Sequence, residues 1–287
     1  MSASRKTKES QARTLEALWG RDPGRSARGP KRGLSVEKIA STAIGIADEE
    51  GLDGISMQQV AGRLGYTAMS LYRYVPGKEQ LVDIVYDRAI GPPPGRAAPG
   101  VSADGAGGTA DEPGEPGRPD SGAPDGRDWR AGVYHWVRSI LKVYDRHPWL
   151  LDITMSTPPL GPNQLAWLDA LLQEVADIGL EDDEMLFLAM FVGGAVRDLA
   201  RTSRELAQAP DRTGVTVREM GENYARAMRE LMDGSRFPAL SRLVASGVFE
   251  PGDTAYNDIV PSLDFGLQRL LDGVESRVRS ARGAPGA

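Results

Sequence analysis

The sequence predicts an all-α fold, and three observations support this class. Apolar residues recur at helical spacing through most of the chain, Ser or Thr precedes and Gly follows several of these periodic runs, and continuous β-type alternation is absent. A chain of helices alone builds its core by packing helix on helix. With 287 residues, the length allows about two domains.

Four helices are predicted before residue 91, at about 36–50, 57–64, 68–74 and 78–90. The first has Ser35 as its N-cap, Gly51 as its stop and an apolar stripe at i, i+4, i+7 and i+8. The stripe consists of Ile39, Ala43, Ile46 and Ala47.

The second and third helices form a predicted helix-turn-helix. Ser56 and Gly65 bound the second helix, whereas the third is capped by Thr67 and ends before Pro76. Two short helices joined by a turn containing Gly, on a preceding longer helix, are typical of this motif. The fourth helix, with Leu81 and Val85 on its inner face, leads out of the region.

A Gly/Pro-rich stretch divides the chain. Residues 91–127 contain 10 Gly and 8 Pro among 37, with Val101 as their only large apolar residue, so we expect a disordered linker. We therefore predict a basic arm at 1–33, a helix-turn-helix domain at 34–90, the linker at 91–127 and a larger domain at 128–281. Helices in the last region are predicted at about 128–146, 148–156, 163–178, 182–207, 216–233, 238–246 and 254–280.

Composition excludes several classes of function. The chain has no Cys and two His, at 135 and 147, which argues against disulfides, thiol catalysis and a His/Cys metal site. We find no G-x-S-x-G, P-loop or dinucleotide fingerprint, so we expect no enzymatic activity and no cofactor. No apolar run approaches membrane-spanning length and no signal peptide is evident, which favours the cytoplasm.

Charge is distributed unevenly along the chain. Residues 1–90 hold 14 Lys and Arg against 11 Asp and Glu, a balance of +3, and the remainder holds 20 against 29, a balance of −9. The first 32 residues alone hold 9 basic against 3 acidic. This asymmetry indicates that a polyanion would meet the N-terminal part, where RSARGPKRG at 25–33 is either a minor-groove arm or a solvated tail.

The stretch YTAMSLYRYVPGKEQL at 66–81 is the candidate DNA-facing surface. The second helix of a helix-turn-helix enters the major groove with its N-terminal residues at the bases. Ala68 and Met69 suit apolar contact with a thymine methyl, and Arg73 is able to pair bidentately with a guanine or a phosphate. Lys78 opens a helix, where the dipole disfavours a cation unless a phosphate binds there. The alternative is that the tyrosines pack half-buried and Lys78 lies in a solvated rim.

These residues together resemble the DNA-binding domain of the tetracycline-repressor (TetR) family over about 35–90. The motif is Gly51-Leu52-Asp53-Gly54-Ile55-Ser56-Met57, then Val60-Ala61-x2-Leu64-Gly65, Ser70-Leu71-Tyr72-x-Tyr74-Val75 and Lys78-x2-Leu81. RHPWLLDI at 146–153 and FGLQRLLDGVE at 265–275 resemble the C-terminal domain of the same family. The family's DNA contacts would fall on Gln58, Thr67, Ala68, Met69, Ser70, Tyr72, Arg73, Tyr74 and Lys78. Tyr74 replaces a common histidine, and the linker replaces a usually short connection.

The resemblance also implies a homodimer on palindromic DNA and a small-molecule pocket in the C-terminal domain. Dimerisation would use helices at about 182–207 and 254–280, and the alternative is that both complete a monomer core. The candidate interface residues are Leu188, Phe191, Val192, Ala195, Leu263, Leu267 and Leu270. The candidate pocket residues, which are equally compatible with ordinary core packing, are Trp136, Tyr144, Trp149, Met155, Trp167, Met190 and Arg197.

We therefore expect a ligand-responsive DNA-binding regulator that a small-molecule effector releases from its operator. The alternatives are an architectural DNA-binding protein without an effector and an enzyme, which no motif supports.

Overall fold

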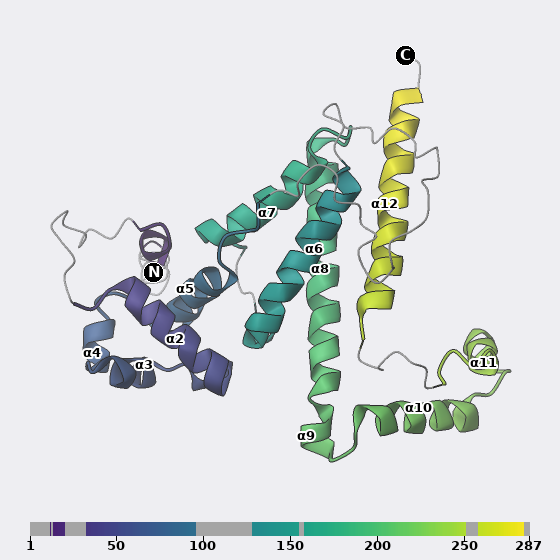
Figure 1. Ribbon diagram of the computed structural model, residues 1–287, viewed down its shortest axis with the longest axis horizontal. Coiled ribbons are helices and arrows are strands. Elements are labelled where there is room, and N and C mark those ends of the chain that lie inside the picture. The colour runs from purple at the N-terminus through teal and green to yellow at the C-terminus, as the bar shows by residue number, and fades with distance from the viewer. Residues whose placement is uncertain are drawn as a thin grey trace, which may run out of the picture. The chain divides into compact units, whose positions relative to one another are not determined.

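A computed structural model describes residues 12, 14–20, 33–95, 128–154, 158–250 and 258–283, and every regular element in these ranges is a helix (Figure 1). The all-α prediction is confirmed. The chain divides into two compact units, Met1–Phe191 with Val278–Ala287, and Val192–Arg277. This division differs from the predicted domain boundaries, which stay a prediction. Most of the predicted linker, 96–127, and residues 21–32 of the arm lie outside the described ranges.

Four helices and a short 3-10 turn form the N-terminal part of the first unit. They are α2 (Val36–Glu50), η1 (Leu52–Gly54), α3 (Met57–Leu64), α4 (Ala68–Leu71) and α5 (Lys78–Ile90). Ser35 accepts from the Lys38 N–H and Ser56 from the Gln59 N–H, as the caps predicted. Gly65 ends α3 with φ of 73°, a left-handed conformation that favours glycine.

The third predicted helix is shorter than expected. It ends at Leu71, and the amides of Tyr74 and Val75 both bond back to the Leu71 carbonyl in a turn. Pro76 explains this early end, because the residue before a proline is disfavoured in helical conformation. Thr67 is the N-cap residue, but its hydroxyl lies 3.0 Å from the Ser70 hydroxyl rather than capping the helix.

The core of this part is closed by residues from all four helices. Ile39, Val60, Leu71 and Leu81 are each fully buried, with 0 % of their surface exposed. Leu64, the last residue of α3, is only half-buried. Burying such a side chain contributes about 1.5–3 kcal/mol to stability. Burial of Leu71 therefore helps to hold the short helix α4 in place.

The remaining helices follow the predicted order with local differences. They are α6 (Trp129–Arg146), η2 (Pro148–Asp152), α7 (Pro162–Val175), α8 (Asp182–Ala207), α9 (Ala209–Thr213), α10 (Val217–Leu231), α11 (Pro238–Ala245) and α12 (Val260–Gly283). The expected helix at 148–156 is instead a 3-10 turn, because Ile153 turns to extended backbone. The last helix begins at Val260 rather than near 254, with Pro261 in the first turn, where proline is tolerated.

Two features of these helices were not anticipated from the sequence. The short α9 was missed, and α10 begins with a capping box in which Thr216 and Glu219 satisfy each other's backbone amides. Among the described residues, no helix is long and apolar enough to cross a membrane.

Candidate nucleic-acid interface

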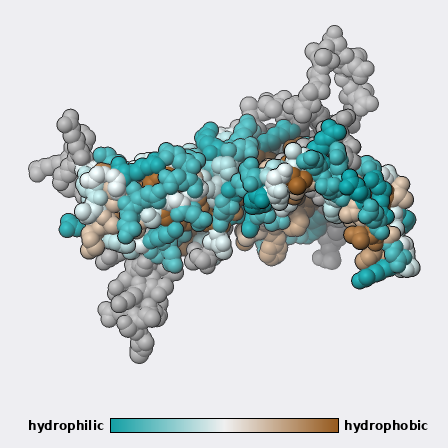
Figure 2. Space-filling model, turned by 90° about the horizontal axis from the view of Figure 1, so that it is seen from below, coloured by the Kyte–Doolittle hydropathy of each residue, from teal (hydrophilic) through white to brown (hydrophobic). Residues whose placement is uncertain are grey.

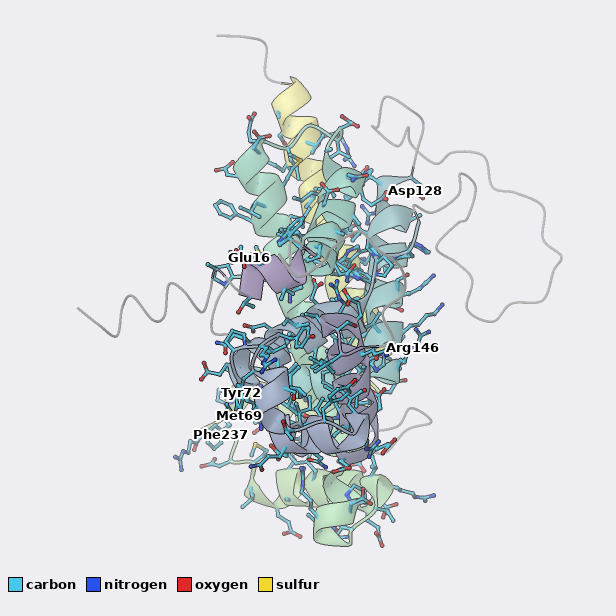
Figure 3. The ribbon with its side chains drawn as sticks, turned by 90° about the vertical axis from the view of Figure 1, so that its left-hand side faces the viewer. Glu16, Met69, Tyr72, Asp128, Arg146 and Phe237 are labelled. Carbon is cyan, nitrogen blue, oxygen red and sulfur yellow. The ribbon has the colours of Figure 1, made fainter. Side chains whose placement is uncertain are left out.

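The predicted DNA-facing residues lie at the start of α3, on α4 with its N-cap, in the turn after α4 and at the start of α5. Leu71 and Val75 are both 0 % exposed and fix α4 and the turn after it to the core. Met69 is 74 % exposed and Tyr72 43 %, and Figure 3 shows both labelled on one side of this part of the molecule. Gln58, Thr67, Arg73 and Lys78 are also exposed or partly exposed, whereas Ala68, Ser70 and Tyr74 are half-buried.

Two cations on this surface lack an intramolecular partner. Within the described ranges neither Arg73 nor Lys78 forms an ion pair, in contrast to Arg63 and Arg88. Gly77 begins α5 without a side-chain cap, so the first amides of this helix have no capping acceptor. A lysine and open amides at one helix end make a suitable place for a phosphate oxygen.

The orientation of α3 is fixed by an acidic cluster at the end of α2. The Arg63 guanidinium lies 2.5 Å from a Glu49 carboxylate oxygen and 3.2 Å from one of Glu50, and the Gln59 amide donates to Glu50. The hydrogen bond from Arg63, reinforced by its charge, lowers the pKa of Glu49. These contacts join the last turn of α2 to α3 and offset the charge of the two carboxylates.

The sequence reasoning missed Tyr66, which was noted among the aromatics but given no role. It is 42 % exposed and lies in the turn just before α4, beside Thr67. Its phenol offers a further hydroxyl donor to a phosphate next to α4. The signal was its position in the motif, one residue after the glycine that ends α3.

The last turn of α5 is tied to the first turn of α7. A carboxylate oxygen of Asp87 accepts the backbone amides of Asn163 (2.9 Å) and Gln164 (3.0 Å), and the Asn163 side chain donates to the Asp87 carbonyl (2.8 Å). Asp87 is 0 % exposed, and burial raises the pKa of its carboxyl against the lowering effect of these amides and of Arg88. A Cβ at Gly161 would come within 2.1 Å of this carboxylate, so glycine is required there. We call this set of contacts the α5–α7 junction.

A second junction joins α2 to η2. One carboxylate oxygen of Asp48 lies 2.7 Å from the Trp149 indole nitrogen and 2.7 Å from His147 Nδ1. Trp149 is 2 % exposed, and its ring meets His147 edge-on at 5.9 Å. We call the surface formed by the start of α3, by α4 with the turn after it and by the start of α5 the reading surface. Helix α2, which supports this surface, is therefore held to the segment that follows α6.

The predicted pocket residues are mostly buried, and the indole nitrogens of the three tryptophans are engaged in hydrogen bonds. The Trp136 indole donates to the Trp167 carbonyl (2.8 Å), and the Trp167 indole donates to the Gly91 carbonyl (3.0 Å). With Trp149 bonded to Asp48, these indoles are able to offer a ligand only apolar surface. Tyr144 is buried and Arg197 half-buried, Met155 lies outside the described residues, and Met190 is 62 % exposed. The pocket stays a prediction.

The predicted interface residues divide into three groups by exposure. Leu188, Val192, Leu263 and Leu267 are buried within the chain, Ala195 and Leu270 are half-buried, and Phe191 is 63 % exposed. Two further large apolar side chains on these helices are exposed, Phe187 (65 %) on α8 and Phe265 (68 %) on α12, and Met190, which was assigned to the pocket, is exposed as well. Brown patches interrupt the mostly hydrophilic surface in Figure 2. Helical periodicity identified the helices but not which of their faces the chain itself covers.

Comparison with known proteins agrees with this geometry. The family model described as bacterial regulatory proteins, tetR family, matches residues 39–85, and the tetracyclin repressor-like C-terminal domain matches residues 121–278. The HTH-type transcriptional repressor DrrR1 of Streptomyces coeruleorubidus is 36 % identical over 273 residues, covering 95 % of this chain and 88 % of the relative. The HTH-type transcriptional repressor Rv1353c of Mycobacterium tuberculosis is 26 % identical, covering 92 % and 89 %.

Solved structures share the fold. ActR of Streptomyces coelicolor, a TetR family protein crystallised in complex with actinorhodin, superposes with a TM-score of 0.58 at 24 % identity, covering 88 % of this chain and 100 % of that chain. The names of the relatives indicate a transcriptional regulator, and the predicted resemblance is confirmed. This chain, with a helix-turn-helix region and a C-terminal domain that both match, belongs to the tetR family of bacterial regulatory proteins.

Proposed function

We propose that this protein is a cytoplasmic repressor that binds a palindromic operator as a homodimer and leaves it when a small molecule binds. The observation that carries the proposal is the surface of α4 and its neighbours. Exposed apolar, hydroxyl and cationic side chains lie together there on α4, in the turn after it and at the start of α5, and the buried Leu71 fixes α4 to the core. Such a surface combines base readout with phosphate contacts, as a recognition helix requires.

Dimerisation would rest on an exposed apolar face of α8. Phe187, Met190 and Phe191 are each more than 60 % exposed, and they lie at i, i+3 and i+4 of one helix. Gly194 continues this face, and a Cβ added there would meet nothing within 4 Å. Large exposed apolar side chains beside a glycine suit close packing of a second helix, and a second copy of this chain is the partner we propose.

Ligand response would act through α5. This helix begins at the reading surface with Lys78, and its last turn carries Asp87 of the α5–α7 junction, so a change at α7 is able to move the reading surface. The buried indoles of Trp136 and Trp167 meet edge-on at 5.6 Å beside this junction and form an apolar wall. A ligand that binds more tightly to one arrangement of α5 shifts the population toward it.

DNA binding is tested first with the full-length chain. A duplex is selected from a random pool, and its variants are titrated with the wild-type protein, Arg73→Ala and the control Arg242→Ala, which removes an exposed cation from α11. Arg73→Ala should weaken binding about 5- to 150-fold, which corresponds to about 1–3 kcal/mol, and relax the preference at one position of each half-site. Failure to select any sequence, or equal losses for the control, would contradict the proposal.

The dimer is tested by sedimentation of Phe191→Arg against Leu243→Arg, which introduces the same charge at an exposed apolar site on α11. Only Phe191→Arg should dissociate the dimer, since it places a charge at the centre of the proposed interface. Dissociation by Leu243→Arg alone would move the interface to α11.

An architectural DNA-binding protein is the alternative, and a ligand distinguishes the two. Actinorhodin, bound in the solved structure of ActR, is the first probe to add to the protein–DNA complex. Release of the duplex by this or another screened compound supports the repressor. Tight DNA binding that no compound in a broad screen relieves favours the alternative.

A further inference from the structure

The segment before the DNA-binding region packs against the α5–α7 junction. Residues 14–18 are helical, and Thr14, Ala17 and Leu18 are buried. Leu15 and Trp19 are 36 % and 47 % exposed, so Leu18 is the large apolar side chain that this segment buries. Glu16, labelled in Figure 3, lies on the exposed side of this segment.

Two hydrogen bonds attach this segment to both sides of the junction. The Trp19 indole nitrogen donates to the Leu160 carbonyl (3.0 Å), in the loop that leads into α7. The Arg88 guanidinium, from the last turn of α5, donates to the Leu18 carbonyl (3.3 Å). Residues 14–20 therefore bridge α5 and the start of α7 from outside.

Arg88 connects this bridge to the buried carboxylate of the junction. Its other terminal nitrogen lies 3.6 Å from Asp87, whose carboxylate accepts the first amides of α7. The three elements thus share one polar network, in which Arg88 neutralises part of the buried charge. Without the N-terminal segment, Arg88 would be able to turn toward solvent.

We propose that residues 14–20 act as a regulatory strap that holds α5 against α7 and sets how readily the reading surface moves. The inference rests on the proposed function, because α5 carries the response to ligand. The sequence between the strap and Gly33 contains five Arg or Lys and one Asp over residues 21–32. Phosphates that attract these cations would bias the strap as well, and by reciprocity the state of the strap would bias DNA affinity.

Amide hydrogen exchange of the full-length protein measures the strap without any ligand. Trp19→Phe removes only the indole donor and keeps an aromatic ring, and Glu16→Ala is the control on the same segment. A single hydrogen bond of ordinary net strength changes a local opening equilibrium about 2- to 13-fold. We expect Trp19→Phe to speed exchange by this factor at the end of α5 and the start of α7, with α3 and α4 unchanged.

A variant that lacks residues 2–20 provides a second test of the strap. It should raise exchange at the junction more than Trp19→Phe and should change affinity for the selected duplex, whereas Glu16→Ala should do neither. Unchanged exchange at the junction in the deletion variant, or an equal increase through α2 and α3, would overturn the strap. If the wild type selects no duplex, the proposed function fails, and the exchange experiment still decides whether the strap holds the junction.

Discussion

Asp87→Ala tests whether the junction between α5 and α7 holds these two helices together. The substitution removes the acceptor for two backbone amides and one side-chain amide at the start of α7. Loss of a helix N-cap costs about 0.5–2 kcal/mol, and a donor left unpaired in a buried site costs about 1–3 kcal/mol. Relief from burying a carboxylate opposes these losses, so we expect a net destabilisation of about 2–3 kcal/mol.

Urea unfolding of the full-length protein, followed by far-UV circular dichroism, measures this difference. Asp87→Asn is the matched control, because its remaining oxygen is still able to accept both backbone amides while its NH₂ faces the Asn163 amide and Arg88. We expect Asp87→Asn to cost about 1 kcal/mol. An Asp87→Ala protein within about 0.5 kcal/mol of wild type would refute the reasoning.

The difference in stability between wild type and Asp87→Asn should depend on pH, and the sign of this dependence is defined. Burial raises the pKa of Asp87 in the folded state above its ordinary value of 3.8, so the folded state binds this proton more tightly than the unfolded state. Its contribution to the free energy of unfolding is then complete below about pH 3.8 and declines as pH rises through the raised pKa. The stability of wild type relative to Asp87→Asn should therefore fall over this window. A rise would mean that the amides and Arg88, rather than burial, dominate the site.

Three further predictions concern other parts of the chain. Lys78→Ala should weaken binding to selected and random duplexes by similar factors. The slope of log affinity against log salt concentration should become shallower by about one for each phosphate that the lysine neutralises. An unchanged slope in titrations at several salt concentrations would refute the phosphate contact. Asp48→Ala should destabilise the protein by about 1–3 kcal/mol, because the buried Trp149 indole is deprived of its acceptor, whereas the exposed Asp53→Ala should lie within about 0.5 kcal/mol of wild type by urea unfolding. Deleting 96–125 should leave melting temperature and duplex affinity nearly unchanged, since it shortens the linker by a little over two halvings and each halving changes the closure cost by only about 0.6 kcal/mol. A large drop in melting temperature would contradict the linker assignment.

Local sequence determined the helices and the likeness to the family. The bounds of α2, α3, α5 and α8 match the predicted ranges, because each of these helices is marked by residues within or beside it, such as Ser56 before α3 and Gly65 after it. The exposed set on α4 followed from one fact, the burial of Leu71, since helical geometry then fixes which neighbours face away. α4 itself was predicted too long because the residues before Pro76 continue the helical spacing, whereas their amides, those of Tyr74 and Val75, both bond to the Leu71 carbonyl in a turn.

Tertiary structure alone decided the partners of these elements. The N-terminus of α7 is capped by Asp87, 76 residues earlier in the chain, and Trp149 bonds to Asp48, 101 residues away. Periodicity shows that a helix has an apolar face but carries no information on what covers it, so it could not separate the buried Leu188 from the exposed Phe191. The docking of Leu18 at the last turn of α5 was equally hidden, because a short segment acquires its position from long-range contacts and not from its own spacing.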